Sequence, residues 1–362
     1  MLDLTGSLYL GLRHASAELD GWDALTTGVP AALDQPDLAR EVAARLAALV
    51  GAERGLLYRS TLHAFLDLFS SWQDVAVVVD DAGYPIARWP LAGRTCAGVP
   101  VVSFPHRDVA VLSRRLTGVS PSLRPVVLAD GWCTGCARTA PVAEYLRVLR
   151  PYGGVLVLDD TQALGVLGER PSPTAPYGHG GGGSTRWTGT RSAALVQVDS
   201  LAKAFGAPVA LLAGSAGLVD EVGRRGPTRV HSSAPSTADL RAAEHALAVN
   251  TRHGDRVRAR LLWLVRRFRK RMGARGVGMT VGEFPIQRLA PTSRQRAMAM
   301  HSWLLRAGLR TVVTGLRCRP GAAVTVVLTA ALGAADVDRA AHLLAEAAAR
   351  IPARPVDVEG AL

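Results

Sequence analysis

Lysine is rare in this chain, and one of its two lysines has an unusual setting. Lys203 and Lys270 are the only lysines, although lysine and arginine together number 42. Lys203 follows an apolar, strand-like run and precedes small residues, where a solvated surface charge is unexpected. Arginine keeps its proton, whereas a lysine amine in a partly desolvated pocket can lose it, attack a carbonyl and form a Schiff base. We therefore predict a covalent role for Lys203, the alternative being an ordinary cation at a helix end.

Other polar groups have the positions that a lysine-held aldehyde cofactor requires. Asp159 ends a nearly apolar run, where its carboxylate can keep a ring nitrogen protonated. Gln162, three residues later, can direct an amide N–H at the same ring. Ser200 and the Ser60–Thr61 turn offer hydroxyls and backbone N–H groups for a phosphate. Each group also has a plainer interpretation, because an aspartate at a strand end and a serine before a helix often serve only as helix caps.

The segments that carry these residues alternate between apolar runs and helical patterns. This alternation predicts an α/β fold with a mostly parallel sheet covered by helices, and such sheets bind ligands at the carboxyl ends of their strands. The expected strands are residues 55–58, 75–79, 99–102, 125–128 and 154–160, and the expected helices are residues 38–50, 62–72 and 141–149.

The composition changes beyond Ser236, where helices rich in alanine, arginine and leucine alternate with short apolar runs. This pattern indicates a smaller C-terminal α/β domain. Its short strands are expected near residues 287–289, 311–313 and 324–328. The predicted organisation is an N-terminal arm at 1–36, a large domain at 37–240 and a small domain at 241–362. A glycine-rich run, Gly178–Ser184, is expected to be either a mobile flap over the site or a plain linker.

Charge and composition argue against several classes of protein. The net charge of +12 raises the question of nucleic-acid binding, but the densest basic run, Arg256–Arg271, has the apolar spacing of an amphipathic helix with its charges in solvent. No stretch is long and apolar enough for a membrane span. The segment Met1–Thr5 lacks the features of a secretory signal, so we expect a cytoplasmic protein.

The four cysteines are too few for a disulfide framework. Cys133 and Cys136 have CxxC spacing, but neither a second pair nor a histidine cluster accompanies them in the sequence to complete a zinc site. We therefore expect these cysteines to have no metal-binding or redox role.

Two motifs together resemble a known family. Leu158–Gly168 reads Leu-Asp-Asp-Thr-Gln-Ala-Leu-Gly-Val-Leu-Gly, and Ser200–Gly206 reads Ser-Leu-Ala-Lys-Ala-Phe-Gly. Both resemble motifs of the α-oxoamine synthases, which are fold-type I pyridoxal-phosphate (PLP) enzymes. The segments Leu2–Leu12 and Ala140–Pro141 extend the resemblance over almost the whole chain. It implies a large PLP-binding domain with a mostly parallel seven-stranded sheet, followed by a smaller C-terminal α/β domain.

The resemblance also implies roles for individual residues. Lys203 is implied to form the Schiff base with PLP, Asp159 to pair with the pyridinium, and Ser200 to contact the phosphate. Thr134 is implied to lie near the ring. The pair Ser232–Ser233 falls where the family presents hydroxyls to the phosphate across a dimer interface, which implies a homodimer.

Several positions around the cofactor depart from the family pattern. Tyr84 stands where the family has a histidine stacked on the ring, so it can serve as an aromatic plate but not as a proton carrier at neutral pH. Gln162 replaces a second histidine, and its amide can donate to the phenolate oxygen of PLP but cannot titrate. The turn Ser60-Thr61-Leu62 replaces a Gly-aromatic-x-Asn turn, and it remains the candidate for contacts to the cofactor there.

The strand expected near the C-terminus lacks the arginine with which the family binds the substrate's carboxylate. Its residues 323–329 carry no charge. A charge-assisted arginine contact is about twice as strong as a neutral hydrogen bond, so its loss predicts a changed substrate. Arg317 or Arg319, just before this strand, is the candidate to supply the charge from another direction.

Three functions remain open. The first is a PLP enzyme that joins an amino acid or amine to an acyl thioester, carried by coenzyme A or an acyl carrier, in specialised metabolism. The second is an aminotransferase, lyase or decarboxylase on the same scaffold, which the missing arginine favours. The third is a non-catalytic descendant, and the retention of Lys203 in so lysine-poor a chain argues against it.

Overall fold

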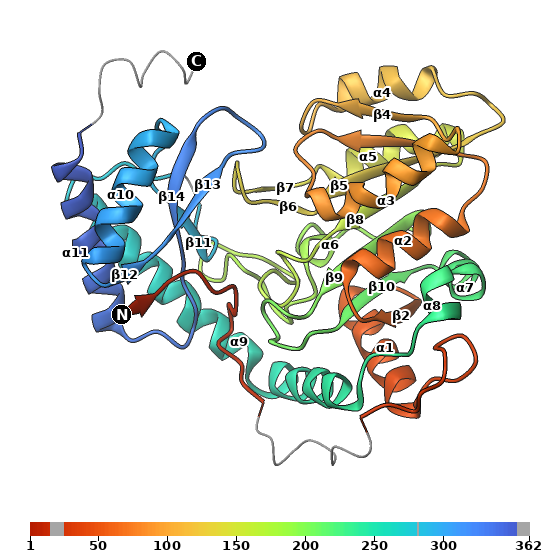
Figure 1. Cartoon of the computed structure of the whole chain (residues 1–362), viewed down its shortest axis with the longest axis horizontal. Helices are drawn as coiled ribbons and strands as arrows, with labels where there is room; N and C mark the ends of the chain where they lie inside the picture. The colour runs from red at the N-terminus through yellow and green to blue at the C-terminus, as the bar shows by residue number, and fades with distance from the viewer. Residues whose placement is uncertain (15–24, 281, 353–362) are drawn as a thin grey trace. The chain divides into compact units, whose positions relative to one another are not determined.

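The computed structural model describes residues 1–14, 25–280 and 282–352 of the 362-residue chain. Its internal contacts divide the chain into two compact units. The large unit comprises Leu12–Cys133 and Thr139–Asp255, and the small unit comprises Met1–Gly11, Thr134–Arg138 and Arg256–Leu362. Figure 1 labels the elements of both.

A seven-stranded sheet forms the centre of the large unit. Its order is β2-β10-β9-β8-β5-β3-β4, and all strands run in one direction except β10, which is antiparallel to both of its neighbours. The predicted α/β fold with a mostly parallel seven-stranded sheet is thereby confirmed. The strands are β2 (Arg54–Tyr58), β3 (Val75–Asp80), β4 (Val101–Phe104), β5 (Arg124–Asp130), β8 (Val155–Asp159), β9 (Leu195–Ser200) and β10 (Ala210–Gly214).

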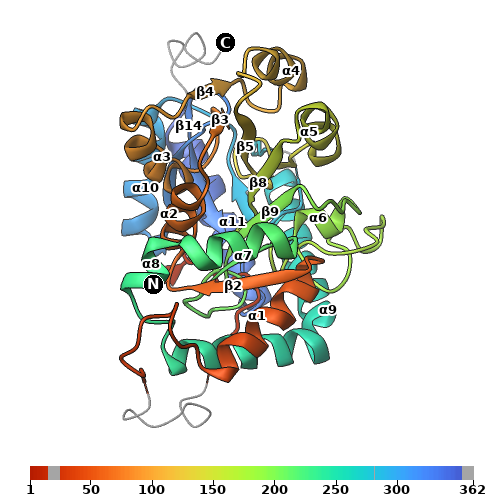
Figure 2. The ribbon, with the colours of Figure 1, turned by 90° about the vertical axis from the view of Figure 1, so that its right-hand side faces the viewer.

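Helices connect these strands and cover both faces of the sheet (Figure 2). Side chains of α2, α3 and α7 build the core on one face, and those of α4 and α5 build the core on the other. The helices of this unit are α1 (Asp37–Val50), α2 (Thr61–Ser71), α3 (Pro85–Cys96), α4 (Val109–Thr117), α5 (Val142–Leu149), α6 (Ser184–Trp187), α7 (Ala216–Arg225), α8 (Pro227–His231) and the part of α9 (Thr237–Gly273) up to residue 255, with a 3₁₀ turn at Arg150–Tyr152.

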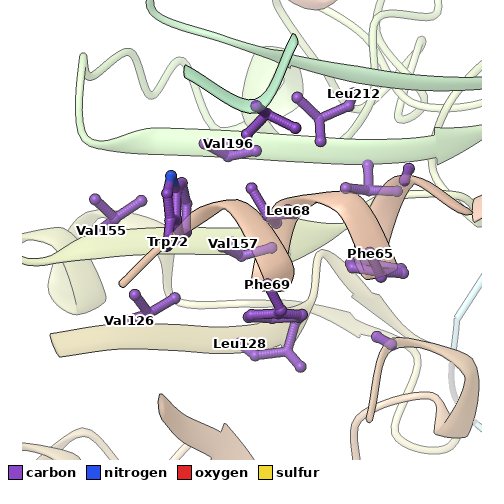
Figure 3. Packing of buried hydrophobic residues seen from close by; sticks show 14 of the residues in the cluster. Phe65, Leu68, Phe69, Trp72, Val126, Leu128, Val155, Val157, Val196 and Leu212 are labelled. Carbon is purple, nitrogen blue, oxygen red and sulfur yellow. The ribbon is translucent and has the colours of Figure 1, made fainter. Parts of the chain in front are cut away.

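The packing of α2 shows why this segment forms a helix. Phe65, Leu68, Phe69 and, just past its end, Trp72 recur at intervals of three and four residues, so they share one face. Figure 3 shows their side chains against valines and leucines of β5, β8, β9 and β10. All four are at most 1% exposed. Burying an apolar side chain of this size contributes about 1.5–3 kcal/mol, so α2 is fixed firmly to the sheet.

The small unit contains a three-stranded antiparallel sheet of order β11-β14-β13 and a parallel pair, β1 with β12. The short strands expected in this region correspond to β11, β13 and β14. The elements are β1 (Leu2–Asp3), β11 (Ile286–Arg288), β12 (Leu309–Arg310), β13 (Val312–Gly315), β14 (Ala322–Val327), α10 (Arg294–Arg306), α11 (Ala334–Arg350) and the part of α9 (Thr237–Gly273) from residue 256 onward.

Two further short strands, β6 (Trp132–Cys133) and β7 (Arg138–Thr139), border the CxxC segment. Among the helices of the described ranges, none combines the length and the apolarity needed to cross a bilayer.

The glycine-rich run Gly178–Ser184 is packed into the large unit. The Gly183 N–H donates to the carbonyl of Leu167 at 2.8 Å. A Cβ atom on Gly182 would lie 2.3 Å from the carbonyl oxygen of Leu49, so only glycine fits there. The expectation of a plain linker is wrong, because neighbouring backbone closes directly onto these residues.

Candidate active site

Six parallel strands of the large sheet end at one edge, and most of the predicted site residues lie along it. β2 leads to Ser60, β3 to Tyr84 and β9 to Lys203, and β8 ends at Asp159. β2 shares this direction because it is antiparallel to β10, which in turn is antiparallel to β9. The topology therefore gathers residues that are far apart in the chain at the carboxyl edge, where sheets of this kind bind ligands.

The amine of Lys203 faces an aromatic ring. Lys203 lies in a turn beyond β9, and its Nζ is 5.8 Å from the centroid of the Tyr84 ring. The interpretation of Lys203 as a helix-end cation is wrong, because the residue is half-buried and outside any helix. Lys270, by contrast, is exposed on α9.

The backbone of Tyr84 is fixed from a neighbouring strand. Its N–H donates to Oδ1 of Asp130, the last residue of β5, at 2.8 Å. α3 begins at the next residue, so the chain direction after Tyr84 is set as well. Tyr84 is 48% exposed. Its ring is therefore accessible to a planar ligand that stacks on it, as the ring of a core residue is not.

Asp159 ends β8 in a nearly buried position. It is 7% exposed, and its Oδ1 accepts the N–H of Thr161 at 3.2 Å. The Thr161 hydroxyl in turn accepts the N–H of Ser200 at 3.0 Å, which ties the end of β8 to the end of β9. Gln162 follows in the same turn and is half-buried. Asp159, Gln162 and Ser200 are thus brought together, as a shared ligand requires.

Two further carboxyl groups are buried near Asp159, and the sequence analysis missed the role of one of them. Asp160 accepts the N–H of Ser184 at 2.7 Å and so supports the start of α6. Asp199 is fully buried on β9, and within the described residues neither of its carboxyl oxygens has a hydrogen-bond partner. Burial raises the pKa of Asp160 to about 7. Burial, together with the charges of Asp160 and Asp159, raises the pKa of Asp199 well above its usual range.

The candidate phosphate contacts lie mainly at the start of α2. Ser60 caps this helix, accepting the N–H of His63 at 3.4 Å and contacting its Nδ1 at 2.8 Å. The N–H groups of Thr61 and Leu62 are in the first helical turn, where N–H groups have no intrahelical partner and attract anions. On the β9 side, the Ser200 hydroxyl accepts the N–H of Ala202 at 3.3 Å.

The pair Ser232–Ser233 follows α8 in the large unit. The Ser232 hydroxyl donates to the carbonyl of Thr228 at 2.5 Å, and Ser233 forms an isolated bridge with Pro30. The role of this pair toward a phosphate held by a partner subunit stays a prediction.

Three predicted residues belong to the small unit. Thr134 directly follows β6, and Arg317 and Arg319 are exposed on the turn between β13 and β14. Arg288 on β11, which no motif in the sequence indicates, is only 6% exposed, and its Nε donates to the Thr314 hydroxyl at 3.4 Å. A buried arginine in a short strand adds a further candidate for a substrate carboxylate.

A histidine at the carboxyl edge was also missed. His106 follows β4, and its Nδ1 lies 2.9 and 3.0 Å from the two carboxylate oxygens of Asp80, at the end of β3. Burial alone lowers the pKa of His106, but interactions with Asp80 and Cys133 outweigh burial and raise this pKa to about 9. The signal in the sequence was a histidine directly after an apolar run.

Comparison with known proteins now decides the family. The family model for aminotransferases of classes I and II matches residues 25–344, which is most of the chain. The chain belongs to this family. It is a PLP-dependent transferase, and pyridoxal 5'-phosphate is its cofactor, as predicted.

This class I/II aminotransferase-family enzyme also has named relatives. It is 31% identical over 317 residues to the 8-amino-7-oxononanoate synthase of Halorhodospira halophila, covering 85% of this chain and 74% of the relative. It is 29% identical over 318 residues to that of Chromohalobacter salexigens, covering 85% and 79%. The predicted relationship to the α-oxoamine synthases is confirmed.

Solved structures share its fold. Serine palmitoyltransferase from Sphingomonas wittichii matches with a TM-score of 0.82 at 18% identity, covering 97% of this chain and 88% of that chain. The 8-amino-7-oxononanoate synthase of Francisella tularensis matches with a TM-score of 0.75 at 17% identity, covering 95% and 97%.

The described residues of this aminotransferase-family enzyme fit PLP. The cofactor needs an amine, an aromatic plate and a carboxylate for its ring nitrogen. Lys203, Tyr84 and Asp159 supply these groups from the ends of strands in one sheet. The unsatisfied N–H groups at the start of α2 add a place for the phosphate at the same edge.

Proposed function

We propose that this enzyme joins an amino acid to an acyl thioester. The observation that carries the proposal is the approach of the Lys203 amine to the Tyr84 ring, with Asp159 at the end of the adjacent strand. The identity to 8-amino-7-oxononanoate synthases supports an acyl condensation rather than another PLP reaction. When bound, PLP supplies an electron sink for the electron pair released at the substrate's α-carbon.

Lys203 performs two tasks in this proposal. Its Nζ would hold the cofactor through a covalent bond that the substrate's amine can replace, and the Lys203 amine would be placed to take up the proton of the α-carbon. The new carbon–carbon bond forms at the thioester carbonyl, whose carbon–sulfur bond breaks, and the thiol leaves. Because the amine is half-buried, water competes poorly for this proton.

The neighbours of Lys203 orient the reaction. The Tyr84 ring would support one face of the cofactor. The Asp159 carboxylate stabilises a positive charge on the ring nitrogen, since opposite charges interact more strongly away from water. Gln162 would donate its amide to the phenolate oxygen, and Thr134 remains a residue that we expect to act near the ring.

The phosphate is bound by the first turn of α2 and by Ser200 in this proposal. The N–H groups of Thr61 and Leu62, at the start of α2, would donate to it, with the Ser60 N-cap beside them. The pair Ser232–Ser233 contacts the phosphate of a partner subunit, so the functional form is a homodimer. Light scattering on the holoenzyme tests this point, and a monomer that retains full activity would contradict it.

The residue that binds the substrate's carboxylate differs from the family pattern. Arg317 or Arg319 supplies its charge in our proposal, since β14 carries no arginine. That same absence favours one second candidate, an aminotransferase, lyase or decarboxylase acting on an amine without a carboxylate. In that case substitution of Arg317 and Arg319 leaves turnover unchanged.

Thiol release is the direct test of condensation. We expect the holoenzyme to liberate free thiol from an acyl-CoA only when an accepted amino acid is present, and the Lys203→Ala variant to liberate none. Conversion of the cofactor to its pyridoxamine form without thiol release would support an aminotransferase instead. A purified protein that never acquires the colour of bound PLP would support a non-catalytic descendant.

A further inference from the structure

A cavity of about 800 Å³ lies at the amino edge of the large sheet, where β8 and β9 begin. Val155, the first residue of β8, and Ala194, just before β9, belong to its lining. Both strands run from this cavity toward the edge with the candidate active site. A strand rises about 3.3 Å per residue, so the path from Val155 to Asp159 spans about 13 Å. The cavity is therefore separate from the residues assigned to PLP.

Aliphatic side chains from both faces of the sheet line this cavity. Leu146 of α5 packs against the core on one face, and Leu218 of α7 packs against the core on the other. Ala143 and Val155 extend the apolar surface. Pockets for small molecules have volumes of about 300–1,000 Å³ and are lined mainly by apolar groups. The cavity can therefore hold the hydrocarbon part of a small ligand.

The charged side chains of the lining are all arginines, namely Arg147, Arg150 and Arg191. Within the described ranges, Arg147 and Arg150 form no ion pair. Arg191 approaches Glu169 at 4.0 Å, but that carboxylate also pairs with Arg186. A cleft with charges of one sign attracts a ligand of the opposite sign. Among the described lining residues none is aromatic, so the cavity offers no ring on which a nucleotide base could stack.

Hydrogen bonds fix the backbone on two sides of the cavity. Beside Arg191, the N–H of Ala194 donates to the Ser192 hydroxyl at 3.1 Å. On the α5 side, the N–H of Gly154 donates to the carbonyl of Leu149 at 3.2 Å. The cavity thus has its shape before a ligand enters, which lowers the entropic cost of binding.

We propose that this cavity binds a medium-chain fatty acid, with its carboxylate at the arginines and its hydrocarbon chain along Leu146 and Leu218. A carboxylate forms paired, charge-assisted hydrogen bonds with the guanidinium fork of arginine. An unbranched chain suits an aliphatic lining, because it buries no polar group that would need a partner there. The site does not rest on the condensation proposed above, since none of its residues is assigned to PLP or to the substrate.

Binding of decanoate to the PLP-loaded enzyme, measured by isothermal titration calorimetry, tests the charged part of the site. Arg147→Ala combined with Arg150→Ala should weaken binding by about 10-fold or more, as expected for the loss of a charge-assisted hydrogen bond. The matched control combines Arg114→Ala with Arg115→Ala, which removes two exposed arginines from α4, outside the cavity. This control should bind decanoate like the wild type.

Two further ligands separate the head group from the chain. Decyltrimethylammonium has the same chain with a positive charge, and inorganic phosphate has negative charge without a chain, so both should bind more weakly than decanoate. Ala143→Trp fills the apolar part from an exposed position on α5 and leaves the arginines in place, so it should also weaken decanoate binding. The proposal is overturned if the Arg147/Arg150 double variant binds decanoate like the wild type, or if either alternative ligand binds as tightly.

A photoreactive decanoate locates the bound chain in the wild-type enzyme, independently of how the variants fold. Cross-linking followed by peptide mass spectrometry should label residues 143–155, 190–194 or 218. Labelling confined to peptides at the catalytic edge would place the fatty acid in the active site and overturn the proposal. Neither measurement uses turnover, so a failure of the condensation would not alter the outcome.

Discussion

The Nζ atom of Lys203 lies 5.8 Å from the centroid of the Tyr84 ring. The two residues come from different parts of the large sheet, Lys203 from the turn after β9 and Tyr84 from the segment after β3. Their approach brings together a nucleophile and a flat apolar surface, which are the two groups that hold a planar aldehyde in position.

Lys203→Ala should abolish the covalent attachment of PLP without unfolding the protein. Treatment of the wild-type holoenzyme with borohydride should fix the cofactor to Lys203, as located by peptide mass spectrometry. Lys270→Ala is the matched control, because Lys270 is the other lysine and is exposed on α9. A PLP adduct that borohydride still fixes in Lys203→Ala would contradict the assignment of Lys203 as the anchor.

The Tyr84 ring, rather than its hydroxyl, should matter for cofactor binding. Stacking of aromatic rings contributes about 0.5–1.5 kcal/mol, so Tyr84→Ala should weaken PLP binding by about 2- to 10-fold. Tyr84→Phe keeps the ring and should bind PLP like the wild type. Fluorescence titration of the apoprotein with PLP measures both, and equal losses in the two variants would point to the hydroxyl instead.

Asp159→Asn should slow loss of the substrate's α-proton. An adjacent opposite charge shifts a pKa by about 1–3 units, so removal of the Asp159 charge should lower the ratio of protonated to unprotonated ring nitrogen by about 10- to 1000-fold. Exchange of the α-hydrogen with deuterated solvent, followed by NMR, reports this step alone. Unchanged exchange in the variant would show that Asp159 does not act on the ring nitrogen.

Asp160 and Asp199 should make stability depend on pH. Their carboxyl pKa values are raised by folding, to about 7 for Asp160, from an ordinary value of 3.8. The folded state therefore binds more protons than the unfolded state, so this contribution to stability is full below pH 3.8 and is lost as the pH rises through the folded pKa.

The variant Asp199→Asn isolates this effect, because asparagine has nearly the same shape as aspartate but no carboxyl group that can ionise. Relative to wild type, its free energy of unfolding should increase as the pH is raised from about 5 to about 8. Urea midpoints at both pH values measure the difference. A wild-type-to-variant difference that does not change with pH would rule out a protonated Asp199.

Trp72→Ala should destabilise the large unit strongly. Trp72 is fully buried against the sheet, and truncation of such a side chain costs about 3–5 kcal/mol. Trp89→Ala changes the same residue type on α3, where the side chain is 62% exposed, and should alter the free energy of unfolding by no more than about 0.5 kcal/mol. Chemical denaturation compares the two, and similar losses would contradict the packing in Figure 3.

Periodicity was sufficient to predict the sheet, and motif order led to Lys203 as the proposed cofactor anchor. The apolar run before Asp159 and the helical spacing of Phe65, Leu68 and Phe69 are local patterns, so they are visible without the fold. The reversed direction of β10 was not visible, because a fully buried strand has the same apolar sequence whether it runs parallel or antiparallel.

The features that escaped prediction depend on contacts between distant parts of the chain. The pairing of His106 with Asp80 was not visible, because the two residues are 26 positions apart in the sequence. In the sequence, Asp199 is a single polar residue near the end of an apolar run. Its burial near Asp160 becomes visible only in the folded sheet. The glycine run reads as flexible, whereas backbone from other loops packs onto it.

The near absence of lysine has a practical consequence for labelling. Apart from the N-terminal amine, the protein has only two amines, one half-buried at the sheet edge and one exposed on α9. A bulky acylating reagent should therefore modify Lys270 first, and a small carbonyl probe should report Lys203 against almost no background.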